Sequence, residues 1–323
     1  MIGGIAAALA VLLAGLGGYL AFGPRERLNL VPRFDGAALP ADLDRYLATE
    51  EAKVGGITPG AEKRIVWAGA AGAETDFAVV YLHGFSATSE EIRPVPDDVA
   101  RRLGANLFFT RFAGHGVGGA RLAGPTAQDW LDDTAEALAV GRRLGRKVIV
   151  IATSTGGTLA AEAALHPAMV RGLAGIVFIS PNFGLGAPGA RLLTLPGVRV
   201  WGPWLAGAEQ CFTPRSAEQA KFWTTCYPTA ALVPMAALAA HAARADYRRV
   251  TVPALFLFTE ADQVVAPAAT RAVAAGWGAP ADVRRLQVGP GDDPYSHVIA
   301  GRILSPGMTA PVEDAILAWV SAR

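Results

Sequence analysis

The chain has 323 residues, 52% of them hydrophobic and 18% charged, which fits one large α/β domain that carries an insertion. Its formal net charge of +1 excludes the strongly basic surface typical of nucleic-acid-binding proteins, so we expect no nucleic-acid partner. The sequence also contains no long charge run, low-complexity tract or internal repeat.

Residues 2–22 are predominantly apolar and contain no charged side chain. A helix of this length just crosses a bilayer, which needs about 20 residues. A cleaved signal peptide and a buried helix are the alternatives. However, the apolar stretch is longer than a usual signal core, no basic residue precedes it, and no clear A-x-A site ends it. We therefore expect residues 1–23 to form an uncleaved anchor that localises the protein to a membrane.

The side of the membrane stays open. Arg25, Arg27 and Arg33 follow the apolar stretch, which places the rest of the chain in the cytoplasm by the positive-inside rule. The only two cysteines, Cys211 and Cys226, lie close together in a long insertion. They are typical either of a disulfide in an exported protein or of two free buried thiols.

A connector follows at residues 24–62, with four prolines and a short helix expected around residues 43–53. The main domain is expected to span residues 63–323. Its first strands are predicted near residues 64–68 and 77–82, where apolar and β-branched residues cluster.

The second of these strands runs directly into His83-Gly84-Phe85-Ser86. A negatively charged tetrahedral intermediate needs N–H donors that are already in position, and a turn after this strand can offer one from the residue that follows the glycine. We therefore predict that the backbone N–H of Phe85 contributes to an oxyanion hole. His83 is expected to be a structural residue of the turn.

Residues 127–143 have apolar side chains at helical spacing, and we expect this helix to pack on the sheet. Asp129, Asp132 and Asp133 are interpreted as solvated charges near its N-terminus. They do not indicate a metal site.

Residues 148–152 are predicted to form a fully buried strand, and small residues then lead into an Ala-rich helical pattern. Ser154 therefore lies on a strand-to-helix turn. Residues 152–156 have the small-x-Ser-x-small form of a nucleophile elbow, although Ala152 stands where glycine is commoner. An ordinary Gly-rich turn with an incidental serine is the alternative for this pentapeptide alone.

A serine hydroxyl becomes a good nucleophile when a histidine takes its proton and an acid orients that histidine. Residues 252–259 are predicted to be a buried strand, and Asp262 follows in the next loop. Asp262 is the predicted acid. Glu260 is the second choice because it lies nearer the strand end, where a carboxylate has less freedom to reach a histidine.

Another strand is predicted at residues 283–288, and the loop after it brings His297 just before a final helix at residues 312–320. His297 is the predicted base. His166 and His241 lie in or beside helical patterns, where a surface or packing role is expected.

The segments HGFS and ATSTGG, the Asp262 loop and SHVIAG together resemble the α/β-hydrolase superfamily, particularly its serine esterases, lysophospholipases and monoacylglycerol lipases. The chain order Ser, Asp, His is the order of that superfamily. Residues 112–116, after a strand at residues 107–110, resemble its GHG loop. The resemblance covers about residues 60–323 and implies a mostly parallel eight-stranded sheet flanked by helices, with a helical lid inserted after the sixth strand.

The gap after the predicted strand at residues 174–179 is about seventy residues long, so it should carry helices of its own. We assign residues 183–250 to the lid. Its many aromatic and aliphatic residues are expected either to form a small core or to line an acyl-chain pocket. The candidate substrate-binding residues are Trp201, Trp204 and Trp223.

These features predict a serine hydrolase that cleaves carboxylic esters of hydrophobic or acyl-chain substrates through an acyl-enzyme on Ser154, assisted by Asp262 and His297. The N–H groups of Phe85 and Thr155 would hold the oxyanion, and neither a metal nor an organic cofactor is expected. The expected partners are a small hydrophobic ester and the membrane. A peptidase, thioesterase, acyltransferase or cofactor-free perhydrolase would use the same triad. A non-catalytic binding protein is the remaining alternative, against which the complete triad argues.

Overall fold

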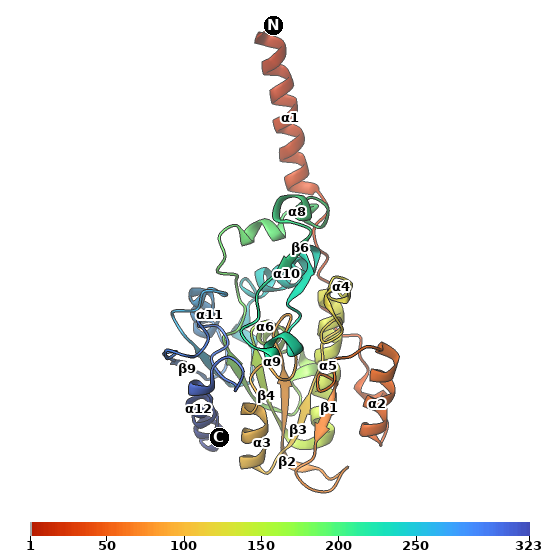
Figure 1. The fold of residues 1–323 in the computed structure, drawn as a ribbon, viewed down its shortest axis with the longest axis vertical. Coiled ribbons are helices and arrows are strands. Elements are labelled where there is room, and N and C mark those ends of the chain that lie inside the picture. The colour runs from red at the N-terminus through yellow and green to blue at the C-terminus, as the bar shows by residue number, and fades with distance from the viewer. Residues whose placement is uncertain (1) are drawn as a thin grey trace.

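The computed structural model describes residues 2–323, with residues 2–4 and 6–10 described by their backbone alone. Its centre is a seven-stranded sheet in the order β1-β3-β2-β4-β5-β8-β9, in which β1 pairs antiparallel with β3 and all other pairs are parallel (Figure 1). Its strands are β1 (Arg64–Val66), β2 (Thr75–Leu82), β3 (Asn106–Phe109), β4 (Gly145–Thr153), β5 (Leu173–Ile179), β8 (Ala254–Phe258) and β9 (Ala281–Arg285). A separate hairpin pairs β6 (Glu209–Cys211) with β7 (Cys226–Pro228).

The α-helices are α1 (Ile2–Phe22), α2 (Leu43–Val54), α3 (Val95–Leu103), α4 (Gly119–Leu122), α5 (Ala127–Leu144), α6 (Thr155–Ala163), α7 (Pro167–Val170), α8 (Val198–Ala206), α9 (Ala217–Phe222), α10 (Leu232–Ala242), α11 (Pro267–Ala275) and α12 (Thr309–Ser321). Short 3-10 helices are η1 (Gly36–Ala38), η2 (Ala190–Thr194), η3 (Thr229–Ala231), η4 (Tyr247–Arg249) and η5 (Pro306–Met308).

Two hydrophobic cores cover the two faces of the sheet. Successive strand residues point to opposite faces, so Val80 of β2 joins one core and its neighbour Val79 joins the other. Residues of α5, α6, α10 and α11 complete the first core, and those of α3 and α12 complete the second. Because both faces are covered at the centre of the sheet, β4, β5 and β8 carry continuous apolar runs, which is why they stand out in the sequence.

The sheet has seven strands among the described residues, and the eight-stranded count implied by the family resemblance is wrong. The chain before β1 forms α2, and a turn at Gly55 and Gly56 with positive φ follows that helix. Pro59, which has no N–H to donate to a neighbouring strand, follows in the same connection. The long insertion consequently follows β5, which is the fifth strand of the sheet in chain order.

The first helix, α1, extends away from the body, and its C-terminal end lies beside α8 (Figure 1). Among the residues that the structure describes, no helix is both long enough and apolar enough to cross a bilayer. The predicted membrane anchor at residues 2–22, and with it the predicted membrane localisation and membrane partner, is therefore wrong.

The connector packs closely on the body. Leu43 and Leu47 of α2 are buried in the first core, and Glu51 accepts two hydrogen bonds from the buried Arg111 side chain, at 2.7 and 2.8 Å. The expectation that Asp133 is solvated is also wrong. Its side chain is only 15% exposed, and its carboxylate pairs with Lys63 Nζ at 3.0 Å.

The insertion between β5 and β8 contains α8, α9, α10 and the β6–β7 hairpin. Cys211 and Cys226 lie opposite each other on the two hairpin strands, with 4.2 Å between their Cα atoms, and they form a disulfide. The hairpin therefore has a covalent crosslink in addition to its backbone hydrogen bonds.

Candidate active site

Ser154 occupies a sharp turn between β4 and α6. Its φ of 50° and ψ of −115° lie in a region that residues with a side chain rarely adopt, as a nucleophile elbow requires. A Cβ atom added to Gly156 would lie 2.2 Å from the carbonyl oxygen of Leu82, so only glycine lets the turn approach β2 this closely. The sequence folds locally in this way because a buried strand runs directly into small residues.

His297 lies between Ser154 and Asp262. Its Nε2 atom is 3.0 Å from Ser154 Oγ, and its Nδ1 atom is 2.9 Å from Asp262 Oδ2. A carboxylate can only accept, so Nδ1 carries the proton and Nε2 is free to accept the hydroxyl proton of Ser154. The structure thus brings together the three residues predicted as nucleophile, acid and base, from loops that follow β4, β8 and β9.

Hydrogen bonds from backbone N–H groups to carboxylates fix the two partner loops. The Oδ1 atom of Asp262 accepts the N–H groups of Val264 and Val265 at 2.8 and 2.9 Å. The Oδ2 atom of Asp293 accepts the N–H groups of His297 and Val298, both at 2.9 Å. Sequence reasoning missed Asp293. The only signal for it was an acidic residue four positions before the predicted base.

The electrostatic surroundings favour the protonated form of His297. Burial alone lowers its pKa, but the nearby carboxylates of Asp262, Glu91 and Asp293 raise it, so that the net pKa lies above the ordinary 6.5. A base with a raised pKa accepts a proton more readily, and the acid partner holds the imidazolium that forms.

Phe85 and Thr155 flank Ser154 with unused backbone donors. Thr155 is the first residue of α6, where an N–H has no partner within the helix. Within the described chain, neither its N–H nor that of Phe85 donates to a backbone or side-chain acceptor. The two donors predicted for the oxyanion hole are therefore available for a ligand, but their role stays a prediction.

His83 is buried below this turn and is held in one tautomer. Its Nε2 atom accepts the N–H of Phe112 at 3.1 Å, so Nδ1 carries the proton and donates to the Gly84 carbonyl at 2.8 Å. Burial, supported by His115 nearby, holds the pKa of His83 well below 6.5. The ring is thus neutral and already used in two hydrogen bonds, as expected for a structural residue.

Backbone strain gathers at this edge of the sheet. Among the described residues, positive φ at a residue other than glycine occurs at Ser86, Ser154, Ser180 and Ser296. Ser86 follows Phe85, Ser180 follows β5, and Ser296 precedes His297. Such strain persists where the surroundings force it and is typical of functional sites.

The insertion contacts the site through the segment around β7. The N–H of Thr224 donates to the Ser86 carbonyl at 2.7 Å, and the ring of Tyr227 packs edge-to-face on Phe85 at 5.3 Å. Trp223, in the same segment, is buried in the core that also holds Val298. These contacts place the insertion directly over the Phe85 turn.

The three tryptophans predicted to bind substrate have different surroundings. Trp204 is 90% exposed, and Trp201 donates its ring N–H to the Pro196 carbonyl at 2.8 Å, beside the end of α1. Neither has a described contact with the triad, whereas Trp223 lies one residue from the Thr224 contact above. A substrate-binding role stays a prediction for all three.

The rejected candidates lie elsewhere. Glu260 is half-exposed and pairs with Arg271 and Arg285. His166 and His241 both contact Glu162, at 3.1 and 3.3 Å. The described residues contain no group of three His, Cys, Asp or Glu side chains suited to a metal ion.

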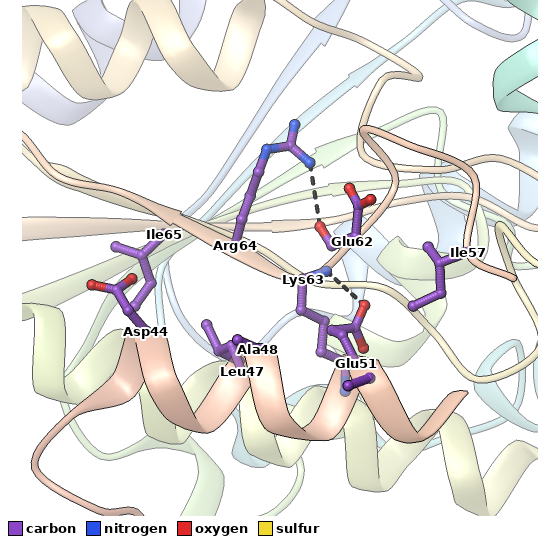
Figure 2. A pocket seen from close by; sticks show the side chains of 10 residues that line it. Asp44, Leu47, Ala48, Glu51, Ile57, Glu62, Lys63, Arg64 and Ile65 are labelled. Atoms are coloured by element: carbon purple, nitrogen blue, oxygen red, sulfur yellow. Dashed lines mark hydrogen bonds between the residues drawn. The ribbon is translucent and has the colours of Figure 1, made fainter. Parts of the chain in front are cut away.

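Two surface pockets lie away from these residues. One, of about 460 Å³, lies between α2 and β1, where the N–H of Lys63 donates to Glu51 and the Arg64 side chain donates to the Glu62 carbonyl (Figure 2). The other, of about 310 Å³, is lined by the amino-terminal ends of β2, β4 and β5 and by α12. In open α/β sheets ligands bind outside the carboxyl ends of the strands, which is the edge where Ser154 lies.

Solved structures of lipolytic enzymes share this fold. The structure described for the metagenome-derived lipolytic enzymes LipS and LipT is 22% identical, with a TM-score of 0.66, over 83% of this chain and 100% of that chain. The monoacylglycerol lipase of Paleococcus ferrophilus is 16% identical, with a TM-score of 0.56, over 80% of this chain and 98% of that one. The monoglyceride lipase of Saccharomyces cerevisiae is 11% identical, with a TM-score of 0.61, over 81% and 91%.

No curated protein matches the sequence significantly. The sequence profile of one family, described as "Serine aminopeptidase, S33", matches residues 73–291, which is more than half of the chain. This range includes the Phe85 turn, Ser154 and Asp262, and it ends shortly before His297. The protein therefore belongs to this family of hydrolases, whose α/β-hydrolase fold it shares with the lipases above.

Proposed function

We propose that the protein is a serine hydrolase that cleaves carboxylic esters of hydrophobic or acyl-chain substrates through an acyl-enzyme on Ser154. One observation carries the proposal. The Ser154 hydroxyl, the His297 ring and the Asp262 carboxylate form a continuous chain of hydrogen bonds of 3.0 and 2.9 Å. This chain can move the hydroxyl proton onto His297 as Ser154 attacks.

In the first half of the reaction, Ser154 Oγ attacks the ester carbonyl carbon while His297 Nε2 takes the hydroxyl proton. The carbonyl oxygen becomes an oxyanion, which accepts hydrogen bonds from the N–H groups of Phe85 and Thr155. The bond to the alkoxy oxygen then breaks, and His297 gives its proton to the leaving alcohol. An acyl ester of Ser154 remains.

In the second half, a water molecule attacks the acyl carbon and His297 takes one of its protons. The new tetrahedral intermediate breaks its bond to Ser154 Oγ, which recovers the proton from His297. The carboxylic acid then leaves. Asp262 accepts the Nδ1–H of His297 throughout, which keeps the ring in one tautomer and stabilises its charged form.

The apolar insertion supports a hydrophobic substrate. The rings of Phe85 and Tyr227 meet edge-to-face, and Trp223 is buried in the same segment as Tyr227. We propose that residues 183–250 act as a lid on a catalytic domain of residues 63–323, with residues 1–23 and 24–62 as an N-terminal segment and a connector. An apolar cover would exclude water and favour an acyl chain.

An aminopeptidase activity is the second candidate, because the family description names serine aminopeptidases. Such an enzyme needs an acidic group to hold the substrate ammonium. Glu91, a carboxylate near Ser154, already accepts hydrogen bonds from Gly84 and Tyr81. Because Glu91 is already used in these two hydrogen bonds, it is poorly suited to bind a substrate ammonium. This favours an esterase over an aminopeptidase.

The test is hydrolysis of p-nitrophenyl esters of increasing acyl length by the full chain, beside Ser154→Ala. Aminoacyl p-nitroanilides and acyl thioesters are measured in parallel, and so is peroxide-dependent halogenation. We expect ester hydrolysis that depends on acyl length and is lost in Ser154→Ala. If the anilides are cleaved faster than the esters, the protein is an aminopeptidase instead, and if the thioesters are cleaved faster, it is a thioesterase. A dominant peroxide-dependent reaction would identify a perhydrolase.

A further inference from the structure

A buried carboxylate lies beside Ser154 without a part in the proposed reaction. Glu91 follows β2 in the chain and is 3% exposed. Its Oε2 atom accepts the Gly84 N–H at 2.7 Å and the Tyr81 hydroxyl at 2.9 Å. A Cβ atom added to Gly84 would lie 2.6 Å from Glu91 Oε1 and 3.2 Å from Ser154 Cβ. Gly84 is thus in direct contact with both the carboxylate and the Ser154 side chain.

Gly84 is held at both of its backbone polar groups. Glu91 accepts its N–H, and the Nδ1–H of His83 donates to its carbonyl at 2.8 Å. The Gly84 carbonyl and the Phe85 N–H belong to one planar trans peptide, so they point in opposite directions. The Gly84 N–H belongs to the preceding His83–Gly84 peptide, so Glu91 holds that peptide while His83 holds the next one. With both peptides held, the direction in which the Phe85 N–H points is fixed.

The same carboxylate is linked to the elbow. The Tyr81 hydroxyl that donates to Glu91 lies 3.2 Å from Thr153 Oγ1, and Thr153 immediately precedes Ser154. Tyr81 belongs to β2 and Thr153 to β4, which are neighbouring strands. One buried network thus joins the Phe85 turn to the residue before Ser154.

An apolar side chain would fill this position without the cost of burying a carboxylate. Burial raises the pKa of Glu91, and the hydrogen bonds from Gly84 and Tyr81 offset part of that increase. An apolar residue, however, could not accept the hydrogen bond from the Gly84 N–H.

We propose that Glu91 is a positioning residue that, together with His83, orients the Gly84–Phe85 peptide so that the Phe85 N–H faces the oxyanion formed at Ser154. The inference rests on the proposed function, since it assigns a role in that same site. Glu91 does not touch the substrate. It acts through the backbone of Gly84, which it holds in place.

If the Phe85 N–H points away from the oxyanion, the transition state is bound less tightly, while binding of the substrate changes less. Loss of one oxyanion donor lowers kcat by about 10²- to 10³-fold, so a misdirected donor in Glu91→Ala should lower kcat by about 10- to 100-fold with KM nearly unchanged. Glu91→Gln keeps an oxygen acceptor in the same shape and should recover most of the rate. Tyr81→Phe removes one link of the network and should lower kcat by about 3- to 10-fold.

Glu90 offers a matched control. It is the neighbouring glutamate and equally buried, but its carboxylate pairs with Arg64, Arg93 and Arg302. Glu90→Gln should therefore leave kcat unchanged, whatever it does to the melting temperature.

The experiment measures kcat and KM for a p-nitrophenyl ester and the rate of Ser154 labelling by a fluorophosphonate, in the full chain and these four variants, with thermal unfolding alongside. The expected order of kcat and of labelling rate is unsubstituted protein and Glu90→Gln, then Glu91→Gln, Tyr81→Phe and Glu91→Ala. The proposal is overturned if Glu91→Ala loses only melting temperature, if Glu91→Gln falls as far as Glu91→Ala, or if Tyr81→Phe is unchanged. If Glu91→Ala does not fold, the kcat of Tyr81→Phe decides.

The two readouts separate this inference from the proposed function. An unsubstituted protein that is labelled at Ser154 but hydrolyses no ester would overturn the esterase, and the ratio of labelling rates would still decide the role of Glu91. An unsubstituted protein that is not labelled would overturn both.

Discussion

The loops that carry Ser154, Asp262 and His297 and the insertion between β5 and β8 meet at one edge of the sheet, but they are held in different ways. The Asp262 and His297 loops are fixed by backbone N–H groups that donate to the carboxylates of Asp262 and Asp293. The insertion reaches the same edge through backbone–backbone hydrogen bonds, from Thr224 to Ser86 and between residues 184–186 and the loop that follows Asp262, and through ring packing around Phe85. We infer that the body sets the chemistry and the insertion sets the choice of substrate.

The largest expected effect is a loss of activity when the triad in the body of the protein is changed. Asp262→Asn removes the carboxylate that holds the Nδ1–H of His297, and an amide can instead favour the wrong tautomer. We expect kcat to fall by about 10⁴-fold on every ester, with little change in melting temperature. Glu260→Gln is the control, because that half-exposed side chain pairs with arginines outside the site. Equal losses in both variants would contradict the assignment of the acid.

The next largest effect is expected on the free energy of unfolding, at the contact between α2 and the body, which lies outside both the loops and the insertion. Glu51→Ala leaves the buried Arg111 guanidinium without its carboxylate, so we expect the free energy of unfolding to fall by about 3–5 kcal/mol. While the protein stays folded, kcat should not change. Glu50→Ala, which removes only an exposed pair with Lys53, should cost less than about 1 kcal/mol in denaturant unfolding. Similar costs for the two variants would show that α2 is not anchored through Glu51.

A smaller effect is expected on the insertion side. The Cys211–Cys226 disulfide closes a loop with a sequence separation of 15, so replacing both cysteines with serine should lower the free energy of unfolding by up to about 3 kcal/mol. The triad loops are untouched, so kcat for a short ester should be retained while KM for long acyl chains rises. A loss of kcat on short and long esters alike would contradict the division of roles.

The smallest effect is a shift in pH dependence. His297 must be neutral to accept the serine proton, and Asp262, Glu91 and Asp293 raise its pKa above 6.5. As the pH falls, kcat/KM should therefore decline with a midpoint above pH 6.5. Asp293→Asn removes one of these charges and should move the midpoint to lower pH. A midpoint below 6.5 in the unsubstituted protein, or a shift to higher pH in the variant, would contradict this electrostatic account.

Much of the fold was predictable because the central strands are buried on both faces. The predicted strand at residues 148–152 lies within β4, and that at residues 174–179 matches β5 closely. Chain order and strand ends were also enough to choose Ser154, Asp262 and His297, which the structure brings together.

The rest depends on contacts that form only once the chain is folded. Asp133 was expected to be solvated, but Lys63, seventy positions earlier, pairs with it and shields it from most of the solvent. The roles of Asp293 and Glu91 depend on which backbone N–H groups the fold turns toward them, and no spacing rule reveals that. The eighth strand came from family resemblance alone, and the residues before β1 form a helix instead.

The central claim is a covalent acyl intermediate on Ser154. The most direct measurement is intact-mass spectrometry of the full chain, quenched in acid within milliseconds to seconds of mixing with an excess of a p-nitrophenyl ester, followed by peptide mapping. The account predicts a mass increase equal to one acyl group, located on the peptide that contains Ser154, absent from Ser154→Ala, and accumulating in a His297→Ala variant only far more slowly. An acyl group on another residue, or ester hydrolysis that persists in Ser154→Ala, would contradict it.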